Sequence, residues 1–259
     1  MGHCWLRNYS VTTILLEGKS CMRPWTDESI RYRKAAAETG LMEQTIARHI
    51  TTYISRESHV CDAGCGLGYL SLELASGFRL VTAVDICQPA LDVLIAAKEK
   101  RGVENIRVVR EDFFSMQGHQ PYDAIVFCNF GSLEEILVSS KRLCRGKAII
   151  IKKNYDYHRF TLTKIPRRGN SFKLTVAKLR TMGIPYEQET FTVETGQPFS
   201  DLQDAIKYIR MNRPDSCAEE ITADKVMRKL VPGPSERYPL QFSAKESFGL
   251  LVVKTEDIP

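Results

Sequence analysis

The fold is decided by the stretch His59-Val-Cys-Asp-Ala-Gly-Cys-Gly-Leu-Gly-Tyr69, a short apolar run that leads into a glycine-rich turn. The run predicts a strand, and the apolar residues after the turn predict a helix. Three glycines, Gly64, Gly66 and Gly68, allow a tight turn and let the backbone approach a ligand closely, because no Cβ atom stands in the way. The first amides of the following helix have no partner inside that helix and would face the ligand. The pattern indicates a site of nucleotide type.

Strand-like and helix-like segments alternate on both sides of this turn. The predicted strands are 59–62, 80–85, 106–110, 122–129, 147–152, 186–194 and 248–254, and the predicted helices between them are 69–75, 89–101, 133–143 and 171–182. Such alternation gives a parallel sheet with right-handed crossovers. We therefore expect an α/β fold, a doubly wound and mostly parallel sheet with helices on both faces.

Two segments lie outside this alternation. Residues 28–53 have apolar positions at helical spacing with Gly40 as a break, and we interpret residues 1–55 as an N-terminal arm and helical cap. Residues 56–259 are the predicted core, and about 196–245 form an insertion much longer than an ordinary loop. The insertion contains two predicted helices followed by the breaker Pro232-Gly-Pro234, and we interpret it as a helical lid before the last strand.

The composition excludes several classes of protein. The 259 residues are 43% hydrophobic and 26% charged, and no apolar run approaches the roughly 18 to 20 residues that span a bilayer. The N-terminus lacks the pattern of a secretory signal, so we expect a cytoplasmic protein without a membrane partner. The eight cysteines are scattered and do not combine with histidines into a tetrahedral set, so no metal site is predicted.

The net charge of +5 is spread over the chain, apart from small basic clusters. A nucleic-acid surface would need a basic stripe with interleaved aromatic residues, and the chain offers a short one over residues 155–168. A solvated loop is the simpler interpretation of that stretch, and a nucleic-acid partner is not expected.

The spacing of the glycines distinguishes between nucleotide ligands. A dinucleotide fingerprint has Gly-x-Gly-x-x-Gly, but its third position here is Tyr69, and the glycine comes one residue earlier at Gly68. A phosphate-binding loop would end in Gly-Lys-Ser or Gly-Lys-Thr, which is absent. The turn therefore disfavours phosphates as the main ligand.

At this point the sequence resembles the class I S-adenosylmethionine-dependent methyltransferases, whose first motif is an acidic residue followed by Gly-x-Gly-x-Gly. The motif here is Asp62-Ala-Gly64-Cys-Gly66-Leu-Gly68, and a second acidic position, Asp85, ends the next strand. The resemblance implies S-adenosyl-L-methionine as cofactor and S-adenosyl-L-homocysteine as product. It also implies a seven-stranded sheet whose last strand is antiparallel.

The resemblance assigns roles to further residues. Asp85 would accept hydrogen bonds from the ribose hydroxyls, Asp112 would lie beside the adenine amino group, and Phe113 would flank the ring. Asn129 is either a cofactor contact or a turn former, and Tyr32 is a contact from the cap. The full set of candidate cofactor residues is Asp62, Gly64, Cys65, Gly66, Gly68, Asp85, Ile86, Asp112, Phe113, Asn129 and Tyr32.

Methyl transfer from a sulfonium is an in-line displacement that depends on alignment and on exclusion of water. Candidate catalytic residues are Tyr155 and His158, just after the predicted strand 147–152. Our first hypothesis is a small-molecule methyl acceptor. The alternatives are an RNA or protein methyltransferase that uses the basic loop 155–168, and a cofactor-binding partner subunit without catalysis. The sequence leaves the oligomeric state open, with a homodimer as one option.

Overall fold

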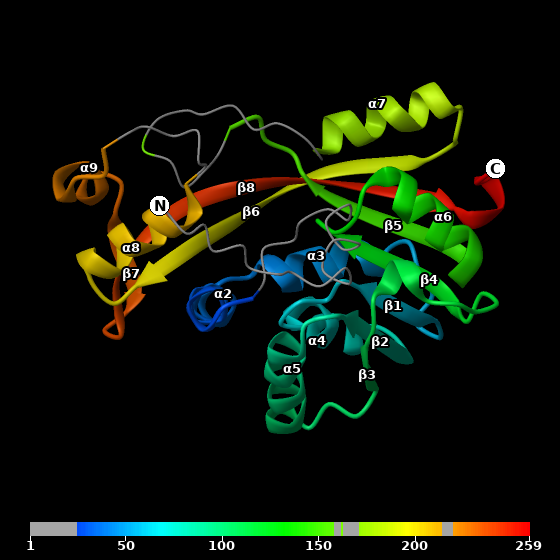
Figure 1. The fold of residues 1–259 in the computed structure, drawn as a ribbon, viewed down its shortest axis with the longest axis horizontal. Helices are drawn as coiled ribbons and strands as arrows, with labels where there is room; N and C mark the ends of the chain where they lie inside the picture. The colour runs from blue at the N-terminus through cyan, green and yellow to red at the C-terminus, as the bar shows by residue number, and fades with distance from the viewer. Residues whose placement is uncertain (1–24, 158–161, 163–170, 214–219) are drawn as a thin grey trace, which may run out of the picture.

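The computed structural model describes residues 25–157, 162, 171–213 and 220–259. Within these residues the strands form one eight-stranded sheet of order β3-β2-β1-β4-β5-β8-β6, and β7 pairs with β8 beside this path (Figure 1). The strands are β1 His59–Ala63, β2 Leu80–Asp85, β3 Ile106–Arg110, β4 Tyr122–Cys128, β5 Cys144–Lys153, β6 Glu187–Phe199, β7 Val231–Ser235 and β8 Tyr238–Lys254. The helices are α2 Asp27–Thr39, α3 Met42–Thr51, α4 Tyr69–Ala75, α5 Gln88–Arg101, α6 Leu133–Leu143, α7 Phe172–Met182, α8 Leu202–Asn212 and α9 Ala223–Met227.

Strands β1 to β5 are parallel, and β8 is antiparallel to both of its long neighbours, β5 and β6. In register, Val60 of β1 lies between Val81 of β2 and Ala124 of β4. The predicted α/β class and the mostly parallel sheet are thereby confirmed. Because the strands are parallel, the carboxyl ends of β1, β2, β4 and β5 meet at one edge of the sheet, where open α/β sheets bind their ligands.

Helices cover both faces of the sheet, which is why its central strands are apolar throughout. Along β5, Ile149 and Ile151 face the core under α3, α4 and α5, while Ala148 and Ile150 face the core under α6 and α7. All four side chains are fully buried. In the described parts of the chain, no helix combines the length and the apolar character needed to cross a bilayer.

The number of strands and the form of the insertion differ from the prediction. The sheet has eight strands rather than seven, because β7 pairs with β8 beside the seven-strand path. Strands β6 and β8 are also longer than predicted and stay paired as far as Phe199 and Leu240. The two helices predicted in the insertion are present as α8 and α9. The flanks of the insertion belong to a strand extension, residues 192–199 of β6 and 238–247 of β8, which carries α8, α9 and β7 at its far end (Figure 1).

The segment predicted as a breaker is the eighth strand. Pro232, Gly233 and Pro234 lie in β7, which pairs with the part of β8 that extends beyond β5. Proline is tolerated there because an edge strand has amides that need no partner in the sheet. A Cβ atom at Gly233 would fall 1.9 Å from the carbonyl oxygen of Tyr238, so this close pairing requires glycine.

Tyr32 of α2 anchors the strand extension and does not lie at the glycine turn. Its side chain is 2% exposed and packs edge-on against Tyr208 of α8, with ring centres 4.8 Å apart. Its hydroxyl donates to Asp204 Oδ1 at 2.8 Å. Tyr32 thus belongs to a core shared by α2, α8 and the extension, and its contact with the cofactor stays a prediction.

We predict that Tyr32→Phe lowers the free energy of unfolding by about 1 to 2 kcal/mol, because it removes a buried hydrogen bond to a carboxylate. S-adenosylmethionine affinity should stay within about two-fold of wild type. Chemical denaturation and calorimetric titration measure the two quantities. A large loss of cofactor affinity without a loss of stability would contradict this structural role.

Candidate cofactor and acceptor site

The glycine turn has the left-handed backbone that its sequence predicts. Gly64, Gly66 and Gly68 have φ values of 68°, 55° and 73°. A Cβ atom at Gly64 would fall 2.3 Å from the Phe130 ring, and one at Gly68 would fall 2.4 Å from Leu94, so both positions exclude a side chain. The turn can therefore bring its backbone directly against a ligand.

Hydrogen bonds join this turn to the end of β2. The amides of Gly64 and Cys65 donate to the carbonyl of Val84 at 2.9 and 3.0 Å. Asp85 is 4% exposed, and its carboxylate accepts from the amide of Gly66 at 2.8 Å and from that of Cys87 at 2.9 Å. The second acidic position is thus part of the structure of the turn.

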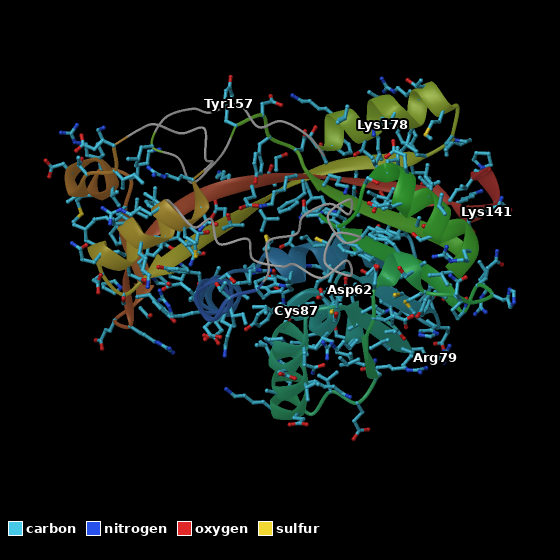
Figure 2. The ribbon with its side chains drawn as sticks, viewed as in Figure 1. Asp62, Arg79, Cys87, Lys141, Tyr157 and Lys178 are labelled. Atoms are coloured by element: carbon cyan, nitrogen blue, oxygen red, sulfur yellow. The ribbon has the colours of Figure 1, made fainter. Side chains whose placement is uncertain are left out.

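Ile86 follows Asp85 and is 56% exposed, unusual for a large aliphatic side chain directly after a buried strand. It offers an apolar surface beside a carboxylate at the carboxyl edge of the sheet. Figure 2 places Asp62 and Cys87, from the neighbouring ends of β1 and β2, in this central region. The arrangement suits a ligand with a hydroxylated ring and a flat apolar ring.

Asp62 lies beneath the turn and is 1% exposed. Burial raises the pKa of its carboxyl to about 6, although the hydrogen bond from Ser71 Oγ, at 2.6 Å, acts in the opposite direction. The nearby Asp85 carboxylate raises this pKa further. Two carboxylates so close together create a negative potential that favours a cationic ligand.

The third acidic position is a helix cap, and the aromatic residue after it is buried. Asp112 accepts from the amide of Phe114 at 3.2 Å and from Ser115 Oγ at 2.8 Å. Phe113 is 2% exposed and packs in the core against Phe127, and its predicted place beside a ligand ring stays a prediction. Phe114 occupies the edge.

Phe114 stacks on Phe130, with ring centres 4.8 Å apart and planes at 7°. Since Phe130 also lies against Gly64, this pair connects the loops that follow β3 and β4 to the glycine turn. The fully buried Lys152 supports the second loop, because its Nζ donates to the carbonyls of Phe130 and Gly131 at 3.2 and 2.8 Å.

Asn129 is a turn former at the end of β4. Its φ is 55°, a conformation that asparagine adopts more readily than most residues. Its amide donates to the carbonyl of Ile151 at 2.8 Å, and its Oδ1 accepts from the amide of Lys153 at 3.1 Å. Asn129 is exposed, so these bonds leave its side chain at the surface of the site.

The N-terminal segment covers the turn through a residue other than Tyr32. A Cβ atom at Gly66 would lie 3.0 Å from Trp25 Cζ2, which places the indole directly over the turn. Arg33 of α2 lies 5.9 Å from the centre of the ring of Tyr69, the first residue of α4. The sequence contained one signal for this cover, a tryptophan immediately before a capped helix.

Beside the strand ends is a cavity of about 400 Å³, which we call the cap pocket. It lies between α2, the end of β5 and the strand extension. Its lining residues are Arg33, Ala36, Gly40, Met42, Lys153, Thr195, Gly196, Gln197, Tyr208, Ile209, Lys229, Phe242, Ser243 and Glu246. Most of them belong to α2, β6, α8 and β8, segments far apart in sequence, so sequence reasoning did not find this pocket.

Two ion pairs organise its charged lining. Arg33 pairs with Glu43 of α3, and Lys153 Nζ lies 3.8 Å from Glu246 Oε2. Lys153 lines the pocket, and its amide donates to Asn129 Oδ1 in the turn that ends β4. This hydrogen bond connects the pocket to that turn. The cap pocket and the glycine turn are therefore neighbouring parts of one edge of the sheet.

Of the predicted catalytic residues, Tyr155 lies near this pocket, with its ring centre 5.7 Å from Lys153 Nζ. His158 lies outside the described residues. Tyr157 is 47% exposed and is found at the periphery of the molecule (Figure 2). Cys128 is a poor nucleophile, because burial raises the pKa of its thiol to about 12. Among the described residues, no three histidine, cysteine, aspartate or glutamate side chains gather as metal ligands.

Comparison with known proteins finds a methyltransferase domain in the part of the chain that contains the glycine turn. Residues 60–146 match the sequence profile of the methyltransferase domain. A 61-residue segment is 33% identical to the uncharacterized protein YbxB of Bacillus subtilis, covering 23% of this chain and 30% of that protein. The match therefore spans less than a third of YbxB.

Solved structures share the fold at low sequence identity. The YcgJ protein of Bacillus subtilis superimposes with a TM-score of 0.51 and 13% identity, over 82% of this chain and 98% of its own. A proposed methyltransferase of Bacillus halodurans C-125 gives 0.54 and 13%, over 83% and 99%. A SAM-dependent methyltransferase of Aquifex aeolicus gives 0.52 and 19%, over 65% and 94%.

The profile match covers the glycine turn, Asp85 and the parallel strands as far as β5, the same elements that build the site. Residues 60–146 are therefore similar to a methyltransferase domain, and the solved structures share the α/β fold of the chain. The domain match supports S-adenosyl-L-methionine as the cofactor, in agreement with the sequence motif.

The raised pKa of Asp62 predicts a specific pH dependence of stability. Its folded pKa of about 6 exceeds the ordinary 3.8, so the folded state favours the protonated form. The stability that this group contributes is full below pH 3.8 and is lost as the pH rises through 6. Asp62→Asn should therefore gain stability relative to wild type over this interval, by roughly 3 kcal/mol in total at about 1.4 kcal/mol per pH unit.

Urea denaturation of both proteins between pH 4 and pH 7 measures this difference. It should grow with pH and level off above about pH 6.5. A difference that is the same at every pH would show that Asp62 ionises normally in the folded protein.

Proposed function

We propose that this chain transfers the methyl group of S-adenosylmethionine to a small molecule bound in the cap pocket. The observation that carries the proposal is the position of this pocket beside the strand ends, linked to the turn after β4 by the bond between Asn129 and Lys153. Its volume of about 400 Å³ lies in the range typical of small-molecule sites, about 300 to 1,000 Å³. In this proposal residues 1–55 are the cap and residues 56–259 are the core.

The residues of the glycine turn fit the cofactor. Gly64, Gly66 and Gly68 adopt the left-handed backbone that turns the chain tightly around Cys65 at the carboxyl edge of the sheet. We assign to Asp85 the ribose hydroxyls, since its carboxylate stands at the end of β2 beside the turn. The negative potential of Asp62 and Asp85 suits a cofactor that carries a sulfonium and an amino group.

In this proposal the adenine end of the cofactor is bound by residues that follow β2 and β3. Asp112 would accept from the adenine amino group, in addition to capping the helical turn after it. The exposed side chain of Ile86 and the edge residue Phe114 would contact the ring faces, in place of the buried Phe113.

When bound, S-adenosylmethionine supplies a methyl carbon activated by a positively charged sulfur. The chain has to align an acceptor with that carbon and to keep water out. Asn129 fixes the turn between cofactor and acceptor, and Trp25 covers the glycine turn from the other side. Tyr155 stands next to the pocket and is our candidate to hold or accept the acceptor proton, with His158 as the second candidate.

Filling the cap pocket should stop methyl transfer and leave cofactor binding intact. Ala36 of α2 lines the pocket, so Ala36→Phe places a ring inside it without altering the glycine turn. The matched control is Lys34→Phe, which adds the same ring to an exposed position of the same helix. We expect Ala36→Phe to lose at least about ten-fold in transfer, and Lys34→Phe to retain it.

Transfer is measured with methyl-labelled S-adenosylmethionine and a cell extract separated into small molecules, RNA and protein. The label should enter the small-molecule fraction. Labelling of RNA or protein that Ala36→Phe does not reduce would favour a large acceptor bound elsewhere. No transfer to any fraction, with the cofactor still bound, would favour a cofactor-binding subunit without catalysis.

A further inference from the structure

Three cationic side chains converge on the cap pocket, and two of them are held by carboxylates, Arg33 by Glu43 and Lys153 by Glu246. Arg33, Lys153 and Lys229 all line it, whereas Glu246 is the single carboxylate among its described lining residues. The three cations come from α2, β5 and the segment after α9, so the strand extension has to fold against the cap before they meet. Cations that converge on one cavity from three elements attract an anion, because their fields add inside a space that water screens poorly.

The two inner cations are set into the pocket rather than spread over its surface. The side chains of Arg33 and Lys153 are 31% and 27% exposed. The guanidinium of Arg33 has five N–H donors, and the bond to Glu43 uses one of them. An arginine held in place by a buried carboxylate can therefore still present a planar pair of donors to an anionic ligand.

The rest of the lining is suited to an apolar body. Met42, Ile209, Tyr208 and Phe242 line the same cavity. Apolar and aromatic walls with a few convergent charged groups are the usual composition of a small-molecule site. A fully hydrated inorganic anion would leave these walls without a partner.

We propose that the acceptor is a small organic anion with an apolar body and a single carboxylate or phosphate, held by Arg33 and Lys153. This inference rests on the proposed function and names the substrate class of the same site. The carboxylate and phosphate forms share the chemistry that the pocket recognises, a planar or tetrahedral set of anionic oxygens.

Glu246 limits the acceptor to one anionic group. Its side chain is 9% exposed and lies 3.8 Å from Lys153 Nζ. An acceptor with a second carboxylate near the first would bring it against Glu246, and two carboxylates in a poorly hydrated space repel each other strongly. Glu246 would thus act as a specificity residue that rejects relatives of the acceptor with a second anionic group near the first.

The test uses matched probes of known charge. Phenylacetate and phenylacetamide have nearly the same shape but differ by one negative charge, phenyl phosphate replaces the carboxylate, and phenylmalonate adds a second carboxylate. Each is titrated calorimetrically into the full-length protein, both free and saturated with S-adenosyl-L-homocysteine. We expect phenylacetate or phenyl phosphate to bind at least ten-fold more tightly than phenylacetamide, and phenylmalonate to bind more weakly than phenylacetate.

Substitutions of the lining residues test whether the preference for an anion arises in the cap pocket. Lys153→Gln and Arg33→Gln should each reduce the preference for the anion about ten-fold, and Glu246→Gln should let phenylmalonate bind as well as phenylacetate. The control is Lys245→Gln on the same strand, whose exposed side chain pairs with Glu194 and does not line the pocket. Thermal unfolding of every variant separates a lost site from a lost fold.

The proposal is overturned if phenylacetamide binds as tightly as the anions, or if Lys153→Gln and Arg33→Gln keep the full preference for the anion. It is also overturned if no probe binds at concentrations up to about 10 mM, roughly the weakest affinity of interest for such fragments. A separate titration with S-adenosyl-L-homocysteine alone measures binding at the cofactor site. Failure of that titration would count against the proposed function, whereas the charge preference would still be measured on the free protein.

Discussion

The hydrogen bonds that Asp85 accepts from Gly66 and Cys87 hold the glycine turn against the end of β2, and the rest of the site depends on them. A left-handed turn of three glycines has high conformational entropy when unfolded, so it needs fixed partners to keep one shape. The carbonyl of Val84 provides a second anchor for the same turn. Asp85 organises the backbone of the turn and also stands at the edge where ligands bind. Its carboxylate can therefore be buried and still belong to the proposed site.

The N-terminal helices and the strand extension add a cavity to this edge, which we propose as the acceptor site. Tyr32, buried between α2 and α8, ties the two together. Their union creates the cap pocket beside Lys153, at the end of β5. The glycine turn is thus built by local contacts, while the cap pocket is built by contacts between segments about 170 residues apart, such as that between Tyr32 and Asp204.

Sequence reasoning reached the parallel half of the fold because its signals are local. Continuous apolar runs at 124–127 and 148–151 mark strands covered on both faces, and a glycine at positive φ marks each turn of the motif. The extension gave no such signal, because the outer parts of β6 and β8 mix polar and apolar residues. They are stabilised by pairing with each other and by the core that they share with α2 and α8. Neighbouring aromatic residues were also ambiguous, since the sequence 113–114 does not show which ring enters the core and which faces the edge.

The central claim is that the glycine turn and Asp85 bind S-adenosylmethionine. It is tested most directly by calorimetric titration of the wild type, Asp85→Ala and the control Asp92→Ala, an exposed change on α5, with S-adenosylmethionine and separately with NAD. Our account predicts binding of S-adenosylmethionine but not of NAD, an affinity at least about ten-fold lower in Asp85→Ala, and no change in Asp92→Ala. Binding of NAD alone, or equal affinity of Asp85→Ala and wild type for S-adenosylmethionine, would contradict it.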